Sequence, residues 1–314
     1  MGWIDTTLLS EVLYILHRTV AFGTPLLLAT LGELVAEKSG ILNLGVEGMM
    51  SMGAVTAFGV SIITGNPWAG VLVAALCVGA LSLLHSVASI NLRGNQVVSG
   101  LALTMLGLGV SGLVGKGYVG MPPGGTIKAM DLPVLKDIPL LGKVIFNQDP
   151  LVYLSIVLAL LIWFVLSRTR IGLNIRAVGE NPAAADVSGI SVYRVRHLCV
   201  FVGGLLAGTA GAYLSLAYIP SWTEGMTGGR GWIVIGLTIF AFWSPLRAIV
   251  CSYIFGLFYV LPYSLQPLGI HVSLLQSMPY LVTILSLVAI SKESLRKRMG
   301  APQALSKAYV REEI

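Results

Sequence analysis

The chain has 314 residues, of which 55% are hydrophobic and 11% charged, with a formal net charge of +6 and a mean hydropathy of +0.84. Soluble domains average about 25% charged residues, so this composition excludes an ordinary soluble enzyme or binding domain. Uncharged runs of 18 or more residues can cross a bilayer as helices. We therefore expect an all-α polytopic membrane protein, formed as a single domain over residues 1–314 with no soluble domain.

The apolar runs predict about nine membrane spans. In chain order they cover residues 11–31, 41–64, 67–90, 96–115, 150–167, 198–217, 231–244, 245–263 and 275–291. The seventh is short for a complete crossing, so we expect it to tilt or to be broken. The membrane-embedded region is thus expected over residues 11–292, followed by a cytoplasmic tail at 293–314.

The distribution of positive charge orients these spans. With a cytoplasmic C-terminus, 14 of the 20 Lys and Arg residues lie on the cytoplasmic side. Cytoplasmic loops of membrane proteins carry such an excess. Nine spans then place the N-terminus outside.

Residues 32–54 hold charged and amide side chains close to or inside apolar runs: Glu33, Glu37, Asn43 and Glu47. Charges at membrane depth usually face a protein interior or an aqueous cavity. For Glu47, two interpretations stay open. It can complement the dipole at the start of a helix, or it can shape the translocation path or a subunit interface, with Asn43 beside it.

Two further segments interrupt the apolar pattern before the middle of the chain. At residues 91–100, Asn95, Gln96 and Ser99 either cap the next helix or offer hydrogen bonds to a polar solute. The Pro- and Gly-rich external segment at 116–149 is either a plain loop or an ordered cap or re-entrant element.

Residues 176–190, RAVGENPAAADVSGI, predict a short polar helix at 182–188 in a cytoplasmic loop. Asn181 suits the N-cap, Pro182 the first helical position and Gly189 the C-terminal stop. About seven helical residues are too few to be stable alone in water. Another element or another chain must therefore hold this helix.

Residues 221–236, SWTEGMTGGRGWIVIG, are rich in glycine and predict a broken helix at membrane depth. Irregular backbone is tolerated there only where protein or water lines it, and broken helices often mark solute paths. Trp222 and Trp232 suit an interfacial belt. Arg230 is either an anchor at the outer interface or, like Trp232, a residue of the path.

Motifs of catalysis do not occur in the sequence. There is no G-x-x-x-x-G-K-[ST] loop for a nucleotide, no HExxH metal pattern and no GxSxG elbow. We expect no catalytic residues, no bound metal and no cofactor, so the energy for transport must come from elsewhere.

Four blocks together resemble one family: GILNLGVEGMMSMGA (40–54), RTRIGLNIRAVGENPAAADVSGISVYRVR (168–196), GGLLAGTAGAYLSL (203–216) and GMTGGRGWIVIGLTIFAFWSPLRAIVCSYIFGL (225–257). They look like the permease subunits of ABC importers of the branched-chain amino acid and ribose type. Within that family the chain is most similar to nucleoside and simple-sugar permeases. The resemblance runs from about residue 12 to 292.

The resemblance implies a type II-like importer permease fold with a cytoplasmic coupling helix that docks on an ATPase. Carried over to this chain, the ATPase contact comprises Gly179, Glu180, Asn181, Pro182, Ala183, Ala184, Ala185, Asp186, Val187, Ser188, Gly189 and Ile190. The flanking Arg168, Arg170, Arg176, Arg194 and Arg196 can meet acidic protein surface or anionic lipid headgroups.

The resemblance also implies partners and a location. These are a cytoplasmic ABC ATPase, a second and longer permease forming a heterodimer, and an extracytoplasmic substrate-binding lipoprotein, all at the bacterial inner membrane and without nucleic acid. The solute expected first is a nucleoside, and second a simple sugar. The alternative class is an ion-gradient-driven secondary transporter, which would place ion-binding carboxylates in mid-span.

Overall fold

The computed structural model describes residues 2–130, 142, 144, 146–266, 271–290 and 300–311. These residues are helical without any strand. The α-helices are α1 (Gly2–Lys38), α2 (Val46–Thr64), α3 (Pro67–Ser86), α4 (Gln96–Gly115), α6 (Pro150–Arg168), α7 (Arg170–Glu180), α8 (Pro182–Val187), α9 (Val192–Tyr213), α10 (Arg230–Phe240), α11 (Pro245–Leu265) and α12 (Val272–Ile290). Short turns follow three of them: the π-helical η1 (Val87–Asn91) and η3 (Leu214–Tyr218), and the 3-10 turn η2 (Lys116–Tyr118).

Seven helices within the described residues are long and apolar enough to cross a membrane. They begin at Leu9, Val46, Pro67, Gln96, Pro150, Val192 and Pro245. The predicted number of nine is not confirmed, because α10 has only 11 residues and α12 is not among the seven. The expectation of a short, broken seventh span is confirmed by that length. Residues 131–141 of the predicted external cap and 291–299 after the last predicted span lie outside the described residues.

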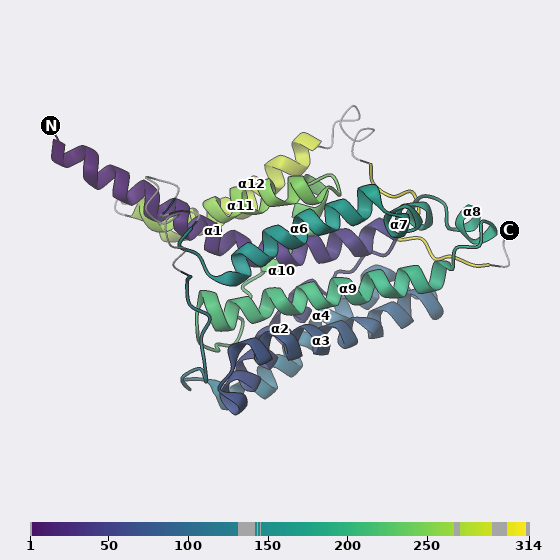
Figure 1. The fold of residues 1–314 in the computed structure, drawn as a ribbon, viewed down its shortest axis with the longest axis horizontal. Helices are drawn as coiled ribbons and strands as arrows, with labels where there is room; N and C mark the ends of the chain where they lie inside the picture. Colours follow the sequence, from purple (N-terminus) through teal and green to yellow (C-terminus); the bar gives the residue numbers. More distant parts are fainter. Residues whose placement is uncertain are drawn as a thin grey trace.

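The helices lie side by side as one elongated bundle (Figure 1). Helix α1 runs through its middle, packed against α9, α10 and α11, and its span is almost wholly buried. Helices α2, α3, α4 and α9 form one side of the bundle, and α6, α11 and α12 lie on the other. Helices α7 and α8 lie together with the C-terminus at one end, which is the predicted cytoplasmic end.

Glycines bring the backbones of neighbouring helices into direct contact. A Cβ atom added to Gly53 of α2 would lie 2.4 Å from the carbonyl oxygen of Gly208 in α9. One added to Gly32 of α1 would lie 2.7 Å from the carbonyl oxygen of Gly203. Small residues permit this close approach between helices in lipid. The high glycine content therefore fixes which helices meet along α9.

The described part of the segment that precedes α6 is an ordered cap at the end of the bundle opposite α8. The amide of Ile127 donates to the carbonyl oxygen of Leu216 in η3 at 2.9 Å. A Cβ atom on Gly124 would clash with the Ser61 carbonyl at the end of α2. For these residues the cap interpretation holds over the plain loop.

Helix α2 begins inside the bundle, well above the predicted cytoplasmic end. Residues 41–45 run without helical structure beside the first two turns of α4. Along them, the Leu42 amide donates to the Gln96 side chain at 2.8 Å, and the Thr104 hydroxyl donates to the Leu44 carbonyl at 2.7 Å. Gln96 and Thr104 are about 12 Å apart along α4, at 1.5 Å per residue. The first turn of α2 is thus deep in the bundle.

Candidate functional site

The first turns of α2 and α10 meet inside the bundle. Glu47, in the first turn of α2, accepts hydrogen bonds from the backbone amides of Gly229 at 2.8 Å and Gly231 at 2.6 Å. The two backbones touch, because a Cβ on Gly231 would lie 2.4 Å from the Glu47 Cα. One buried carboxylate therefore faces the positive ends of two helices. Glu47 thus complements a helix dipole, as the first interpretation expects, and a role in the translocation path or a subunit interface stays a prediction.

This junction is expected at about half the depth of the membrane. Helix α10 is about 16 Å long, from 11 residues at 1.5 Å each, whereas the hydrocarbon core is about 30 Å thick. The turn after α10 carries Trp243, whose indole N–H donates to Glu37 near the predicted cytoplasmic end of α1. With the predicted orientation, the other end of α10 is expected near the middle of the membrane. Phe242 and Trp243 in this turn both have φ of 50°, a conformation that is rare for bulky residues.

The partly buried side chain of Arg230 contacts aromatic rings and backbone carbonyl groups. Its guanidinium carbon is 4.6 Å from the ring centroid of Phe22 and 5.8 Å from that of Tyr218. Its Nη1 atom donates to the carbonyl oxygens of Met226 and Thr227. Aromatic faces and carbonyl dipoles hold the cation, and both interpretations of Arg230, an anchor at the outer interface and a residue of the path, stay predictions.

Aromatic rings surround this arginine. Phe22 stacks on Tyr259 with ring centroids 4.3 Å apart, and it meets Tyr218 edge to face. The guanidinium carbon of Arg18, one turn before Phe22, lies 5.5 Å from the ring centroid of Tyr218. Rings with hydroxyl groups next to a mid-membrane cation and carboxylate are suited to hold a polar, flat solute. We call these groups, with Glu47 and the α10 amides, the α2–α10 junction.

The tryptophans near this junction differ from each other. Trp232 is 43% exposed and follows Arg230 in the first turn of α10. Trp222, expected in an interfacial belt, is 2% exposed and packs against Gly115 in the core. The belt interpretation of Trp222 is wrong, since a glycine on α4 creates the space that buries its ring.

The remaining predicted path residues have partners inside the chain. The backbone amide of Asn43 donates to the Glu33 carboxylate at 2.9 Å. Asn95 is the N-cap of α4, and its side chain accepts from the amides of Val97 and Val98. Ser99 lies 3.0 Å from the imidazole of His85, and Gln96 bonds Leu42 as described above. Capping and bridging account for Asn95, Gln96 and Ser99 in this state, and a role in the solute path stays a prediction for them.

Helix α8 has the local structure that the sequence predicts. The Asn181 side chain caps it by accepting the Ala184 amide at 3.0 Å, Pro182 opens the helix, and Gly189 follows with φ of 84°. Within the helix only Ala185 is buried, whereas Val187 is 74% exposed. The helix therefore presents most of its surface away from the bundle.

The basic residues that flank α8 do not behave alike. Arg168, Arg170 and Arg194 are at least partly exposed, as expected for residues that meet a partner or lipid headgroups. Arg196 is 1% exposed, and its Nε donates to the carbonyl oxygen of Ser39. The expectation of a surface contact is wrong for Arg196, because its guanidinium joins separate segments of the chain.

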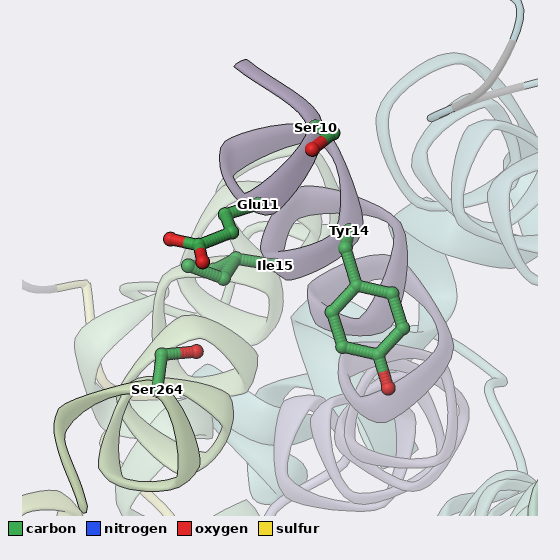
Figure 2. Close-up of a pocket in the computed structure, with 5 residues that line it drawn as sticks. All are labelled: Ser10, Glu11, Tyr14, Ile15 and Ser264. Atoms are coloured by element: carbon green, nitrogen blue, oxygen red, sulfur yellow. The ribbon is translucent and has the colours of Figure 1, made fainter. Parts of the chain in front are cut away.

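Three described hollows lie near the end of the bundle opposite α8. Figure 2 shows one of 370 Å³ between α1 and α11, with Glu11 and Ile15 on the side where Ser264 lies and Tyr14 on another face of α1. A smaller one of 140 Å³ has polar walls, including Arg18, Gln148 and Asp149. Burial raises the pKa of Asp149 above its ordinary value, although the Tyr213 hydroxyl and nearby amides oppose the shift.

No described group of three or more His, Cys, Asp or Glu side chains is arranged to hold a metal ion. A bundle of apolar helices with a short helix that begins at a buried carboxylate, and with a capped polar helix outside the bundle, is typical of a membrane transport protein. Comparison with known proteins makes this class specific. Residues 15–290 match the family described as the permease component of the branched-chain amino acid transport system. The chain belongs to this family.

Relatives match along nearly all of the chain. A protein named "Putative glucose ABC transporter permease protein TsgC13" from Haloferax volcanii is 41% identical over 95% of this chain and 98% of its own length. The guanosine ABC transporter permease protein NupQ of Bacillus subtilis is 36% identical, over 92% and 95%. The nucleoside ABC transporter permease protein NupC of Lactococcus lactis is 35% identical, over 95% and 96%. No solved structure matches the chain significantly.

The protein is therefore a transmembrane permease subunit of an ABC importer, a multi-pass protein of the cell (inner) membrane. It is not itself an enzyme, and ATP hydrolysis takes place in a partner subunit. Such permeases work with an ATPase and a substrate-binding protein. This assignment replaces the alternative of an ion-gradient-driven secondary transporter.

Proposed function

We propose that this subunit forms half of the pathway by which a nucleoside enters the cell, with a simple sugar as the second candidate. The observation that carries the proposal is the α2–α10 junction, where Arg230, Glu47 and aromatic rings meet at mid-membrane depth. Aromatic faces stack on nucleobases, and the charged side chains and tyrosine hydroxyl groups supply hydrogen bonds to hydroxyl and amide groups. The relatives named for guanosine and nucleosides support the first choice, and the relative named for glucose supports the second.

We further propose that residues 179–190, with α8 at their centre, are the contact with the ATPase. The small side chains on the exposed surface of α8 suit a groove. Docking would supply the stability that a helix of six residues lacks. ATP binding and hydrolysis would move α8 and tilt the helices attached to it, so that the pathway opens to each side in turn. The other half of the pathway comes from a second, longer permease, and the solute arrives from a substrate-binding lipoprotein.

Uptake by the reconstituted importer tests the solute class. The chain is incorporated into proteoliposomes with its ATPase, second permease and lipoprotein, and uptake of a labelled nucleoside is measured with ATP inside. We expect uptake that requires ATP, persists with ionophores and is inhibited by excess unlabelled nucleosides but not by glucose. Inhibition by glucose alone would transfer the assignment to a sugar.

A substitution on α8 tests the docking. Ala184 is exposed, so Ala184→Arg leaves the bundle intact while placing a long cation on the surface that docks. We expect ATP-dependent uptake to be abolished, with normal insertion into the membrane and weakened co-purification with the ATPase. Thr64→Arg is the matched control, because it adds the same charge at an exposed position at the other end of the bundle. Normal uptake by Ala184→Arg would refute the docking.

A further inference from the structure

The tail segment, residues 300–311, is packed onto the same end of the bundle as α8 (Figure 1). Buried and exposed positions are interspersed along it: Pro302, Ala304 and Tyr309 are buried, whereas Gln303 and Lys307 are exposed. A segment that merely emerges into water would bury none of its side chains. The tail segment is therefore an integral element of this end of the bundle.

Backbone hydrogen bonds tie the tail segment to two separate elements. The Ala304 amide donates to the carbonyl oxygen of Gly179 in α7 at 2.9 Å, and the Ser306 amide donates to that of Gly40 at 3.3 Å. Gly40 has φ of 92° and would carry its Cβ 3.1 Å from the Ala304 carbonyl oxygen. Glycine is thus required at this turn between α1 and α2 both for its backbone conformation and for the close approach.

Arg196 of α9 reinforces the same connection from inside. Its Nε donates to the Ser39 carbonyl at 3.2 Å, and its Nη1 donates to the Lys307 carbonyl at 3.4 Å. One buried guanidinium therefore joins the α1–α2 turn to the tail segment. A buried charge is costly unless it is hydrogen-bonded, so these contacts are expected to hold the two segments together.

The C-terminal end of the tail segment contacts α8. The Tyr309 hydroxyl donates to Asp186 Oδ2 at 3.0 Å, and Arg311 Nε lies 3.0 Å from the same oxygen. The Tyr309 ring packs in one cluster with Ala185, Val178 and Val192. Ala185 is the buried residue of α8. The tail segment thus contacts α8 at Ala185, the buried residue of that helix, and at Asp186, its acidic residue.

We propose that the tail segment positions α8 for ATP coupling and ties it to the α1–α2 turn. This inference rests on the proposed docking of the ATPase at α8. Residues 41–45 continue from that turn to the first turn of α2. There Glu47 holds the start of α10. A movement of α8 is therefore passed by a contiguous set of contacts to the α2–α10 junction.

The test uses the reconstituted importer and measures solute transported per ATP hydrolysed. Loss of folded or assembled subunit lowers both quantities together and leaves this ratio unchanged, so the ratio separates coupling from mere stability. Tyr309→Phe removes the hydroxyl and keeps the ring, and Arg311→Glu reverses the charge that faces Asp186. Lys307→Glu is the matched control, since it makes the same change of charge on an exposed side chain of the tail segment.

We expect Tyr309→Phe and Arg311→Glu to lower the ratio about two- to tenfold, the range of one net hydrogen bond. Lys307→Glu should keep the wild-type ratio. Combining Tyr309→Phe with Asp186→Ala should have no more effect than Asp186→Ala alone, because both changes remove the hydrogen bond between Tyr309 and Asp186. Equal effects of all three single variants of the tail segment, or additive effects in the double variant, would overturn the inference.

The outcome is distinguishable from failure of the proposed docking. If Ala184→Arg abolishes uptake while Tyr309→Phe and Arg311→Glu keep the wild-type ratio, α8 is the contact and the tail segment does not position it. If Ala184→Arg transports normally, the docking itself is wrong and the inference about the tail segment is overturned with it.

Discussion

At the scale of single residues, Glu47 shows how a costly buried charge is made tolerable. Its side chain is 4% exposed, and each carboxylate oxygen accepts a hydrogen bond from one backbone amide at the start of α10. Helix starts offer unpaired amides and a positive dipole end, so the charge and the two orphan donors satisfy each other. The same residue belongs to the first turn of α2. One side chain thereby stabilises the meeting of two helix ends inside the membrane.

Replacing Glu47 by Gln tests this assignment. Glutamine has one acceptor oxygen, and its NH2 group would face the second amide donor. Hydrogen bonds to a charged group are worth about 1.5–3 kcal/mol, and a factor of ten corresponds to about 1.4 kcal/mol. We expect nucleoside uptake to fall at least about tenfold and the melting temperature of the purified complex to fall.

The control for Glu47→Gln is Glu224→Gln. Glu224 is an exposed carboxylate in the glycine-rich segment before α10, so its neutralisation changes the same charge without touching an α10 amide. Uptake should stay near the wild-type level. Indistinguishable behaviour of the two variants would show that Glu47 does not hold the junction.

At the scale of elements, glycines decide which helices touch and how closely. Gly53 of α2 faces the Gly208 backbone of α9 so closely that no side chain fits between them. Gly231 does the same where α10 meets α2. Hydrophobicity cannot select a partner among helices that are all surrounded by apolar lipid, so shape complementarity between small residues has this role.

A pair of Gly→Ala variants measures that effect. A Cβ at Gly53 would lie 2.4 Å from the Gly208 oxygen, and overpacking of this kind costs about 1–3 kcal/mol. Gly53→Ala is expected to lower the melting temperature of the purified chain in detergent. Gly109→Ala in α4 adds the same methyl group where no atom lies within 4 Å, and it should leave the melting temperature unchanged or slightly higher. Equal changes in both variants would contradict the packing explanation.

At the scale of the whole molecule, the bundle has two functional ends and a junction between them. One end carries α7, α8 and the tail segment, and the other carries the ordered cap over α2 and η3. The excess of Lys and Arg predicts that the first end faces the cytoplasm, where the ATPase works. The α2–α10 junction lies between these two ends, within the bundle of helices that connects them.

Cysteine labelling in cells tests this orientation. In a background where Cys77, Cys199 and Cys251 are replaced by Ala, single variants Val187→Cys and Thr64→Cys expose one thiol at each end. A membrane-impermeant maleimide should label Thr64→Cys in intact cells. It should label Val187→Cys only after the membrane is permeabilised, and the reverse pattern would invert the topology.

Local chemistry determined much of this protein from its sequence. Span length and hydropathy predict the long helices, the Asn181 cap and Gly189 predict α8, and the glycine-rich segment predicts that the seventh span is broken. These properties depend on neighbours along the chain, which is why they can be read from it. The tertiary structure alone decided the pairing of Glu47 with Gly229 and Gly231, the burial of Arg196 and the grip of the tail segment on Asp186. Those contacts join residues more than a hundred positions apart, and they form only where close helix packing brings buried charges to unpaired donors and acceptors.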